Sequence, residues 1–517
     1  MTEPKPAVEP AELPGEAGPA AAAPGGPEGQ GAGPSALSPL VWRAVLGCII
    51  AAAMTVLDLA MTSTVLGSIQ ESMDEPLAKG ALVISAYATA ELITLSLSAF
   101  LTRVFPARTY LVLLVCLFVG GALLSACAWS FESLLVARVV QGAASGAIMP
   151  FAYYAIVVLL PGDKHPKAIS TFSILVTGSY VLAPVLCITL GEWTGWRALY
   201  CVAAPVGALG LWLALPGLRH MRTEASPLGR RVNAVGAGAA VVGLGCTQYA
   251  LDTGQERGWF SSAVVTLVAG AAIAAAVLFV VTELRSRYPL VDLRLLRLRP
   301  FLAGCVFNVV GGVAVYSSYV LIPVYLTTLG FSAADIATVS LYGGTVQLAI
   351  ALGLPLFLRR IDTYLVSCTG ALLFATAALL PFLAGSSPPY VLIVIALMCR
   401  SVGSGLLLAA LGLMATRALS AHQAASGSLL FNMARSLGGS VGAAGCAAFL
   451  TIRQAYHAHA AGLPGADGAG RSVRSLALHD VFAVAFAILL LLALSLVAGY
   501  GLRRLRERRA APLTTDG

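Results

Sequence analysis

Charged side chains are scarce in this sequence: they account for 11% of its 517 residues, whereas 58% of the residues are hydrophobic. In soluble globular proteins about a quarter of the residues are charged. The composition therefore excludes a water-soluble protein and predicts that a lipid bilayer surrounds most of the chain. The net charge of +8 does not indicate nucleic-acid binding, because the basic residues lie in short segments between apolar stretches, where they set orientation in a membrane.

Motifs of catalysis and cofactor binding are also absent from the sequence. No GxxxxGK[ST] loop occurs, which excludes ATP hydrolysis at such a loop as an energy source. The six histidines lie outside the apolar stretches or at their edges, and the ten cysteines occur singly, with no CxxC pair. We therefore expect no enzyme, haem, metal ion or disulfide framework. His457, His459, His479 and Asp480 could bind a metal, but a solvated loop is the simpler interpretation.

Long apolar stretches dominate what is present. A helix that spans a bilayer needs about 20 apolar residues, whereas the strands of a membrane barrel alternate in polarity over about 10 residues. The uninterrupted stretches predict an all-α polytopic membrane protein with fourteen transmembrane helices. The expected spans are 41–68, 80–102, 108–128, 133–160, 167–190, 196–217, 232–251, 260–282, 300–327, 335–358, 364–384, 389–413, 424–450 and 480–501.

These spans divide the chain into five segments. Residues 1–40 are rich in proline, alanine and glycine, which predicts a disordered tail, and they lack the features of a cleavable signal peptide. We expect a six-helix bundle over 41–217, two inserted helices with their linkers over 218–299, a second six-helix bundle over 300–501 and a basic tail over 502–517. Lysine and arginine gather in the loops on one side, which predicts that both termini are cytoplasmic.

A faint internal repeat relates the two bundles. The segment LLVARVVQGAASG (Leu134–Gly146) resembles ALMCRSVGSGLLL (Ala396–Leu408), which pairs Arg138 with Arg400 eight spans later. Parallel repeats of six spans with a cavity between them are typical of secondary transporters, in which one half rocks against the other. The repeat therefore favours transport as the function.

Few ionisable groups lie inside the expected spans, where each is unfavourable by roughly 2.5 to 3.5 kcal/mol or more. Asp58 in the first span and Arg138 in the fourth lie at similar depths, so they can pair, whereas Glu91 lies near the middle of the second span on a polar face. We interpret Glu91 and Asp58 as proton carriers, with Arg138 modulating Asp58, because burial favours a protonated carboxyl and a nearby arginine favours an ionised one. The alternative is a permanent Asp58–Arg138 bridge that only joins two helices, with Glu91 hydrogen-bonded to its neighbours.

A larger set of side chains is expected to line a translocation cavity for a small-molecule substrate. Aromatic groups with few formal charges suit a hydrophobic or aromatic compound. Any single member could equally serve helix packing. The set comprises Gln141, Tyr153, Tyr180, Asn308, Tyr316, Gln347, Asn432 and Arg435.

The membrane portion, about residues 41–501, resembles the fourteen-span drug:proton antiporter branch of the major facilitator superfamily. The first span's LDLAMTSTVLGSI is similar to the family's LDxTIVNVALP signature, the second span's SAYATAEL to SYLLAEA, and the fourth span's LLVARVVQG to the RxxQG motif. The resemblance places Glu91 on the family's acid and implies that Arg138, Gln141 and Gly142 take part in proton transfer. It also implies the major facilitator fold, the proton motive force in place of a cofactor, and export of drugs across a bacterial inner membrane.

Two conformational motifs depart from the family pattern. The loop after the second span, with Arg103 and Arg108, lacks the glycines and the aspartate of the family's GxLaDrxGrr, and the span-five motif GPxxGG appears as APVLCI, which keeps only Pro184. Because larger side chains replace glycines where backbones approach closely, import by symport is the alternative to export, and a receptor without transport is a more remote one. The resemblance further implies a periplasmic adaptor and an outer-membrane channel as partners in a bacterium with two membranes.

Overall fold

The computed structural model describes most of the chain, and the described residues form helices, turns and short connections without a strand. The expected disordered tail lies outside the described residues up to position 38, as does the end of the basic tail from position 511. The described residues are 39–75, 79–191, 194–219, 233–254, 257–258, 261–287, 289–384, 388–416, 419, 421–462 and 471–510.

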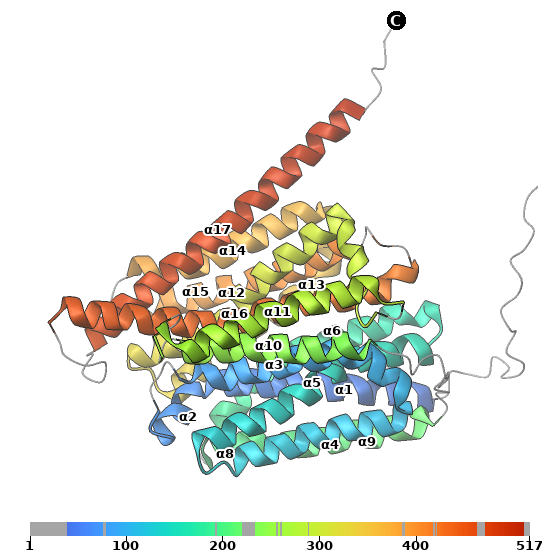
Figure 1. The fold of residues 1–517 in the computed structure, drawn as a ribbon, viewed down its shortest axis with the longest axis horizontal. Helices are drawn as coiled ribbons and strands as arrows, with labels where there is room; N and C mark the ends of the chain where they lie inside the picture. Colours follow the sequence, from blue (N-terminus) through green and yellow to red (C-terminus); the bar gives the residue numbers. More distant parts are fainter. Residues whose placement is uncertain are drawn as a thin grey trace, which may run out of the picture.

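The first half of the molecule consists of six long helical passes, drawn from blue to green in Figure 1. The fifth pass is α6, which continues into a π-helical turn, η2. The sixth pass consists of the short α8 followed by the longer α9. The elements are α1 (Pro39–Thr64), α2 (Leu66–Ser72), α3 (Ala81–Val104), α4 (Ala107–Ala126), α5 (Phe131–Leu159), η1 (Gly162–Lys164), α6 (His165–Leu186), η2 (Cys187–Gly191), α8 (Trp196–Cys201) and α9 (Ala203–Leu218).

The second half again has six long helices, and two inserted helices separate it from the first. The inserted pair is α10 (Ala234–Gly254) and α11 (Ala263–Arg285), followed by the 3₁₀ turn η5 (Leu293–Arg297). The second half comprises α12 (Arg299–Thr328), α13 (Ala333–Arg360), α14 (Thr363–Ala384), α15 (Tyr390–Thr416), α16 (Ala421–Ala460) and α17 (Arg471–Ala510).

The two halves repeat the same packing arrangement. In the first half α1 lies against α5, α6 and α9, and in the second α12 lies against α15, α16 and α17. Likewise α5 packs on α3 and α4, as α15 packs on α13 and α14, and the pair α4 with α9 corresponds to α14 with α17. The described helices therefore form two six-helix bundles of the same design, as the internal repeat predicted.

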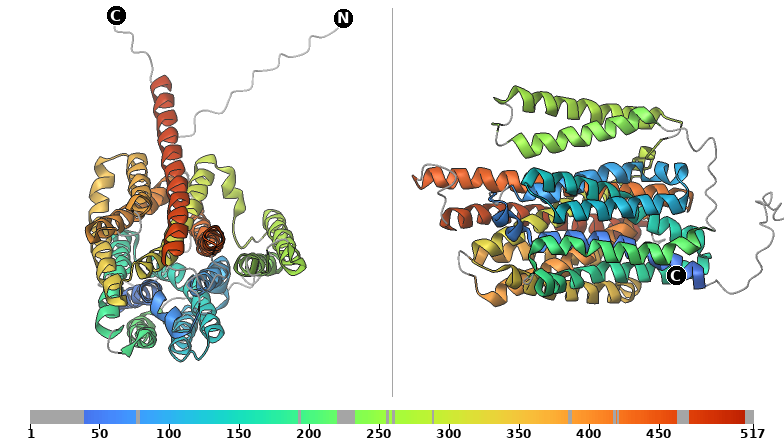
Figure 2. Two further views of the ribbon diagram at one scale, coloured as in Figure 1. Left: turned by 90° about the vertical axis from the view of Figure 1, so that its left-hand side faces the viewer. Right: turned by 90° about the horizontal axis from the view of Figure 1, so that it is seen from below.

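The inserted helices lie on one side of the junction between the halves. They pack against each other, and α10 also contacts α3 of the first half and α16 of the second; the pair stands apart from the bundle in Figure 2. The buried carboxylate of Glu283 in α11 accepts hydrogen bonds from the Asn233 side chain at 2.8 Å and from the Val291 backbone N–H at 3.0 Å. These contacts tie the end of α11 to the segments before α10 and after α11.

Thirteen helices of the described part are long and apolar enough to cross a membrane. The thirteenth expected span, 424–450, lies within α16, which is not among these helices. Glycines, serines, Asn432 and Arg435 lower its mean hydropathy, yet it packs along α12 and α3 like a core helix. At the C-terminus α17 continues beyond the expected span end at 501 to Ala510, so part of the basic tail is helical.

Candidate functional site

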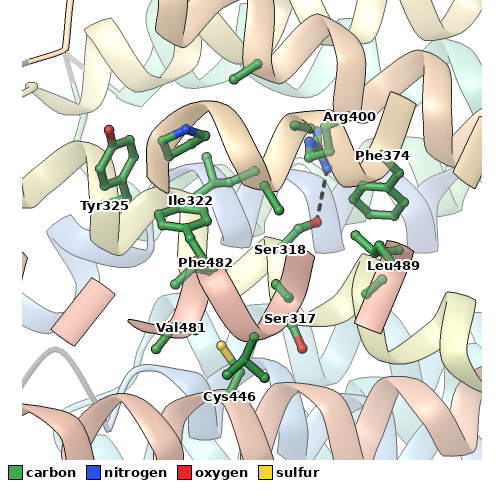
Figure 3. A pocket seen from close by; sticks show the side chains of 18 of the residues that line it. Ser317, Ser318, Ile322, Tyr325, Phe374, Arg400, Cys446, Val481, Phe482 and Leu489 are labelled. Carbon is green, nitrogen blue, oxygen red and sulfur yellow. Dashed lines mark hydrogen bonds between the residues drawn. The ribbon is translucent and has the colours of Figure 1, made fainter. Parts of the chain in front are cut away.

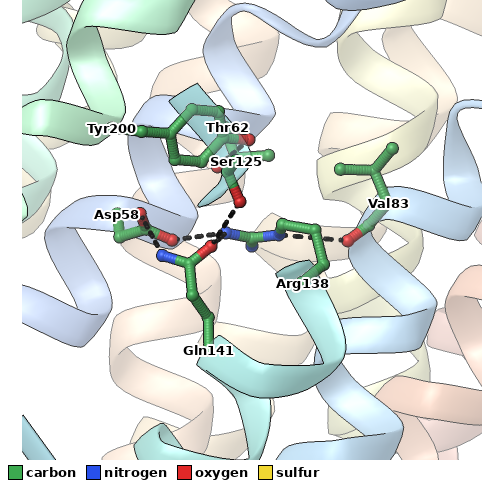
Figure 4. A network of polar contacts seen from close by, with 7 residues as sticks. All are labelled: Asp58, Thr62, Val83, Ser125, Arg138, Gln141 and Tyr200. Carbon is green, nitrogen blue, oxygen red and sulfur yellow. Dashed lines mark hydrogen bonds and ion pairs between the residues drawn. The ribbon is translucent and has the colours of Figure 1, made fainter. Parts of the chain in front are cut away.

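Asp58, Arg138 and Gln141 form a closed polar network between α1 and α5 (Figure 4). The Nη1 group of Arg138 donates to Oδ2 of Asp58 at 2.6 Å and to Oε1 of Gln141 at 2.9 Å, and Nε2 of Gln141 donates to Oδ1 of Asp58 at 3.0 Å. Arg138 and Gln141 are fully buried, and Asp58 is 2% exposed. Both carboxylate oxygens therefore have donors, which a buried charge requires.

The position of Arg138 follows from the local sequence of α5. Arg138 and Gln141 are three residues apart, so they share one helix face. A side chain at Gly142 would collide with the backbone of Tyr87, so this glycine allows α5 to approach α3 closely. The Arg138 guanidinium then lies 4.4 Å from the centre of the Tyr87 ring and 5.7 Å from that of Tyr200, within cation–π range.

Glu91 lies at the junction between the two halves. The hydroxyl of Tyr316 in α12 donates to Oε2 of Glu91 in α3 at 3.3 Å. Glu91 is partly buried and forms no ion pair with any described residue. Its charged neighbour is Arg435 in α16, which acts on it electrostatically without a salt bridge. The carboxyl thus depends on a hydrogen bond donor from the opposite half.

One tyrosine from each half lies near the guanidinium of Arg435: Tyr153 of the first half and Tyr316 of the second. The Nε atom of Arg435 is buried and has no hydrogen bond partner among the described residues. The hydroxyl of Tyr319 donates to that of Tyr180 at 3.0 Å, which joins α12 to α6. The junction is therefore aromatic, with the acidic group of Glu91 on the first half and the basic group of Arg435 on the second.

A cavity of about 50 Å³ lies next to this tyrosine pair, where the halves meet. Pro184 and Gln347, predicted as a conformational motif residue and a cavity residue, both line it together with Tyr180. Ser63 at the end of α1 closes one side, since its hydroxyl donates to the backbone carbonyl of Tyr319 at 2.9 Å. Three predicted residues therefore meet in one place.

A larger cavity, of about 260 Å³, lies within the second half among α12, α14, α15, α16 and α17 (Figure 3). None of the predicted site residues lines it. The sequence signal that could have found it is Arg400, which the repeat pairs with Arg138 and which lies in the cavity wall.

The two predicted asparagines line neither cavity. Asn308, expected in a cavity, instead donates from Nδ2 to the backbone carbonyl of Phe431 at 2.6 Å and joins α12 to α16. Asn432 donates to the carbonyl of Ser428 in its own helix. Tyr153 packs its ring 4.4 Å from that of Phe172.

The predicted loop motif is only partly described. Arg108 is exposed in the first turn of α4, whereas the side chain of Arg103 lies outside the described residues.

His457 and Asp480, which the sequence offered as possible metal ligands, form a small cluster with Arg453. Asp480 accepts from Arg453 Nε at 2.6 Å and contacts His457 Nε2 at 2.7 Å. Across the residues with described positions, no group of three or more histidine, cysteine, aspartate or glutamate side chains is placed to hold a metal ion.

Comparisons with known proteins agree on one family. The family model described as Major Facilitator Superfamily matches residues 48–443. The chain is similar to the multidrug export protein EmrB of Haemophilus influenzae, at 27% identity over 437 residues, covering 80% of this chain and 81% of that protein. It is also similar to the fatty acid resistance protein FarB of Neisseria gonorrhoeae, at 26% identity over 65% of this chain and 66% of that protein.

Solved structures share the fold at low sequence identity. Tetrameric PepTSo2 aligns with a TM-score of 0.61 and 14% identity, over 90% of this chain and 99% of that one.

Proposed function

This chain belongs to the major facilitator superfamily, and we therefore propose that it is a proton-coupled secondary transporter that exports small amphipathic or aromatic compounds. The relatives are named as multidrug export and fatty acid resistance proteins, which favours export over import by symport and over a receptor without transport. Six-helix halves that rock about a central site provide alternating access without a cofactor, driven by the proton motive force.

The observation that carries the proposal is the hydrogen bond from Tyr316 to Glu91 across the two halves. When the halves rock apart, α12 moves away from α3 and the carboxylate loses this donor. An ionised carboxyl without donors in apolar surroundings is unfavourable, so separation favours uptake of a proton by Glu91. Protonation at Glu91 is thereby coupled to the relative position of the halves.

Asp58 and Arg138 have a different part in this proposal, because both belong to the first half. Rocking of the halves does not break their contact, and both Asp58 oxygens already have donors. We assign Glu91 as the primary proton carrier and Asp58 as a second one, which can accept a proton only when Arg138 or Gln141 shifts. Gly142 maintains the close helix approach on which this network depends.

The substrate site in this proposal is the aromatic junction. Tyr153, Tyr180 and Tyr316 present rings and Arg435 presents a positive charge, and the adjoining cavity adds the polar group of Gln347 and the charge of Arg400. Such a surface suits planar or amphipathic compounds. Asn308 holds α12 against α16, whereas Asn432 donates within α16.

The location and orientation complete the proposal. We place the protein in a bacterial inner membrane with both termini in the cytoplasm, so that the loop with Arg103 and Arg108 is cytoplasmic and gates the inner side. The far end of α16 and the start of α17 project beyond the other helices (Figure 1) and carry exposed Tyr456 and Leu476. In a bacterium with two membranes this projection would contact a periplasmic adaptor that leads to an outer-membrane channel.

Reconstituted vesicles test the coupling. The purified protein is inserted into liposomes, a pH gradient is imposed, and accumulation of cationic, neutral and anionic fluorescent aromatic compounds is followed for the wild type, Glu91→Gln and the control Glu132→Gln, whose side chain is exposed. We expect gradient-driven accumulation of at least one compound, its loss in Glu91→Gln and its retention in Glu132→Gln. Equal accumulation by Glu91→Gln would refute Glu91 as the proton carrier.

A further inference from the structure

Arg400 in α15 is a half-buried arginine to which the described residues offer no acidic partner. Its Nη1 group donates to the hydroxyl of Ser318 at 3.3 Å, and its Nε atom is buried with no hydrogen bond partner among the described residues. No described aspartate or glutamate forms an ion pair with it. Its repeat counterpart Arg138, by contrast, is paired with Asp58 at 2.6 Å. A charge left this way in an apolar region calls for a compensating anion.

Most side chains that line the cavity of about 260 Å³ beside Arg400 are apolar. Figure 3 shows Phe374, Phe482 and Leu489 among the side chains that enclose it. Its two serines are already satisfied, since Ser317 donates to the carbonyl of Gly442 at 2.8 Å and Ser318 to that of Val315 at 2.6 Å. The wall therefore offers a ligand mainly apolar contacts.

Tyr325 provides a second unused polar group in the same wall. Its hydroxyl is buried without a partner in the described part of the chain. Tyr325 lies seven residues after Ser318 in α12, about 10 Å along the helix axis. The cavity thus has a cationic group near Ser318, a free hydroxyl group further along α12, and apolar side chains of α14 and α17 around it.

We propose that this cavity binds one small amphipathic anion, with its acid head group on Arg400 and its apolar chain among the side chains of α12, α14 and α17. A guanidinium binds a carboxylate through parallel hydrogen bonds, which would satisfy the unpartnered Nε. The volume lies just below the range of about 300 to 1,000 Å³ typical of sites for drug-sized ligands. The occupant is therefore a single short chain with an acid group, smaller than a phospholipid with two chains.

The position of Arg400 links this site to the junction between the halves. Arg400, Ser318, Ile322 and Leu397 line both the large cavity and the cavity of about 50 Å³ next to Tyr180. A head group on Arg400 therefore lies in the wall that separates the two spaces. Binding at this site does not depend on proton coupling at Glu91, so it can be measured without a gradient.

Equilibrium binding to the full-length protein tests the proposal. The protein is placed in phosphatidylcholine nanodiscs and titrated with decanoate, decanol or decyltrimethylammonium by calorimetry. We expect saturable binding of decanoate, at least tenfold weaker binding of the other two probes, and at least tenfold loss of decanoate affinity in Arg400→Gln but not in Arg453→Gln. Equal affinity for the three probes, or unchanged decanoate binding by Arg400→Gln, overturns the proposal.

Two further arms identify the bound molecule and the site. Ala378→Phe, which adds volume in the wall, should abolish decanoate binding with Arg400 intact, and thermal unfolding confirms that each variant is folded. Displacement of decanoate by chloride alone, or binding of phosphatidylglycerol in place of decanoate, would contradict a short-chain acid. If the wild-type protein binds decanoate but shows no gradient-driven transport, the proposed function is rejected and the binding site is retained.

Discussion

The hydroxyl of Thr89 in α3 lies 2.6 Å from the hydroxyl of Ser440 in α16, and the same two groups each donate at 2.7 Å to the side-chain carbonyl of Gln248 in α10. One residue from each half and one from the inserted pair thus meet at a single buried point. The inserted helices are therefore attached at the junction that must change when the halves rock, and α10 can influence how easily α3 and α16 separate.

Gln248→Leu should weaken this attachment. Hydrogen bonds between membrane helices contribute about 0.6 kcal/mol on average and up to about 1.7 kcal/mol, so we expect a small decrease in stability, because one of the freed hydroxyls of Thr89 and Ser440 can then donate to the other. Thermal unfolding in detergent measures it, with Thr247→Val on the same helix as the control, since the Thr247 hydroxyl donates to the carbonyl of Gly243 in α10 itself. A larger loss in the control would show that α10 itself, and not the junction, is being perturbed.

The Asp58–Arg138 pair predicts strongly coupled substitutions. Removing one partner of a buried ion pair costs about 3 to 5 kcal/mol because the other charge stays buried. We therefore expect Asp58→Asn and Arg138→Gln each to reduce the yield of folded protein sharply, and the double variant to recover part of it. Thermal unfolding of all four proteins gives the coupling energy, and additive effects of the two substitutions would argue against a buried ionic contact.

Tyr316→Phe should separate coupling from substrate binding. The substitution removes the donor to Glu91 but keeps the ring, and a hydrogen bond to a charged group contributes about 1.5 to 3 kcal/mol. We expect gradient-driven transport to fall by roughly tenfold or more, while exchange of labelled for unlabelled substrate without a gradient continues. Parallel loss of both activities would mean that Tyr316 serves substrate binding or folding instead.

Gly142→Leu should disrupt the first half. A Cβ at this position would collide with the carbonyl of Tyr87, and overpacking of this kind costs about 1 to 3 kcal/mol or more. Gly120→Ala in α4 is the matched control, because its Cβ would meet no atom within 4 Å and alanine favours a helix by about 0.5 to 1 kcal/mol over glycine. We expect a lower unfolding temperature for the first variant and an equal or higher one for the second.

Much of the fold could be predicted from the sequence, because the bilayer imposes strict requirements on each segment by itself. A spanning segment must be long, apolar and internally hydrogen-bonded, so its position is visible in the residues of that segment alone. The repeat between Arg138 and Arg400 likewise predicted two six-helix halves. The composition of α16 is the least typical of a spanning helix, because its glycines, serines and Arg435 lower its hydropathy although it packs in the core.

The site was less accessible from the sequence. The depths of Asp58 and Arg138 suggested their contact, since both could be counted from the membrane edges. Counting residues from the membrane edges does not predict the partner of Glu91, the bond of Asn308 to α16 or the contact of α10 with α3. Each of these contacts depends on how helices far apart in the chain are rotated toward one another.

The sequence by itself therefore determined the membrane location, the helices and the few ionisable groups inside them, since these follow from local composition and from the unfavourable energy of burying charge and unpaired backbone in lipid. Only the tertiary structure decided which buried charges are paired. Asp58 compensates Arg138, whereas Ser318 contacts Arg400 and leaves its charge uncompensated beside an apolar cavity. The packing of α1 on α5 is equivalent to that of α12 on α15, so the two corresponding arginines differ because α1 presents Asp58 to Arg138 whereas α12 presents Ser318 to Arg400.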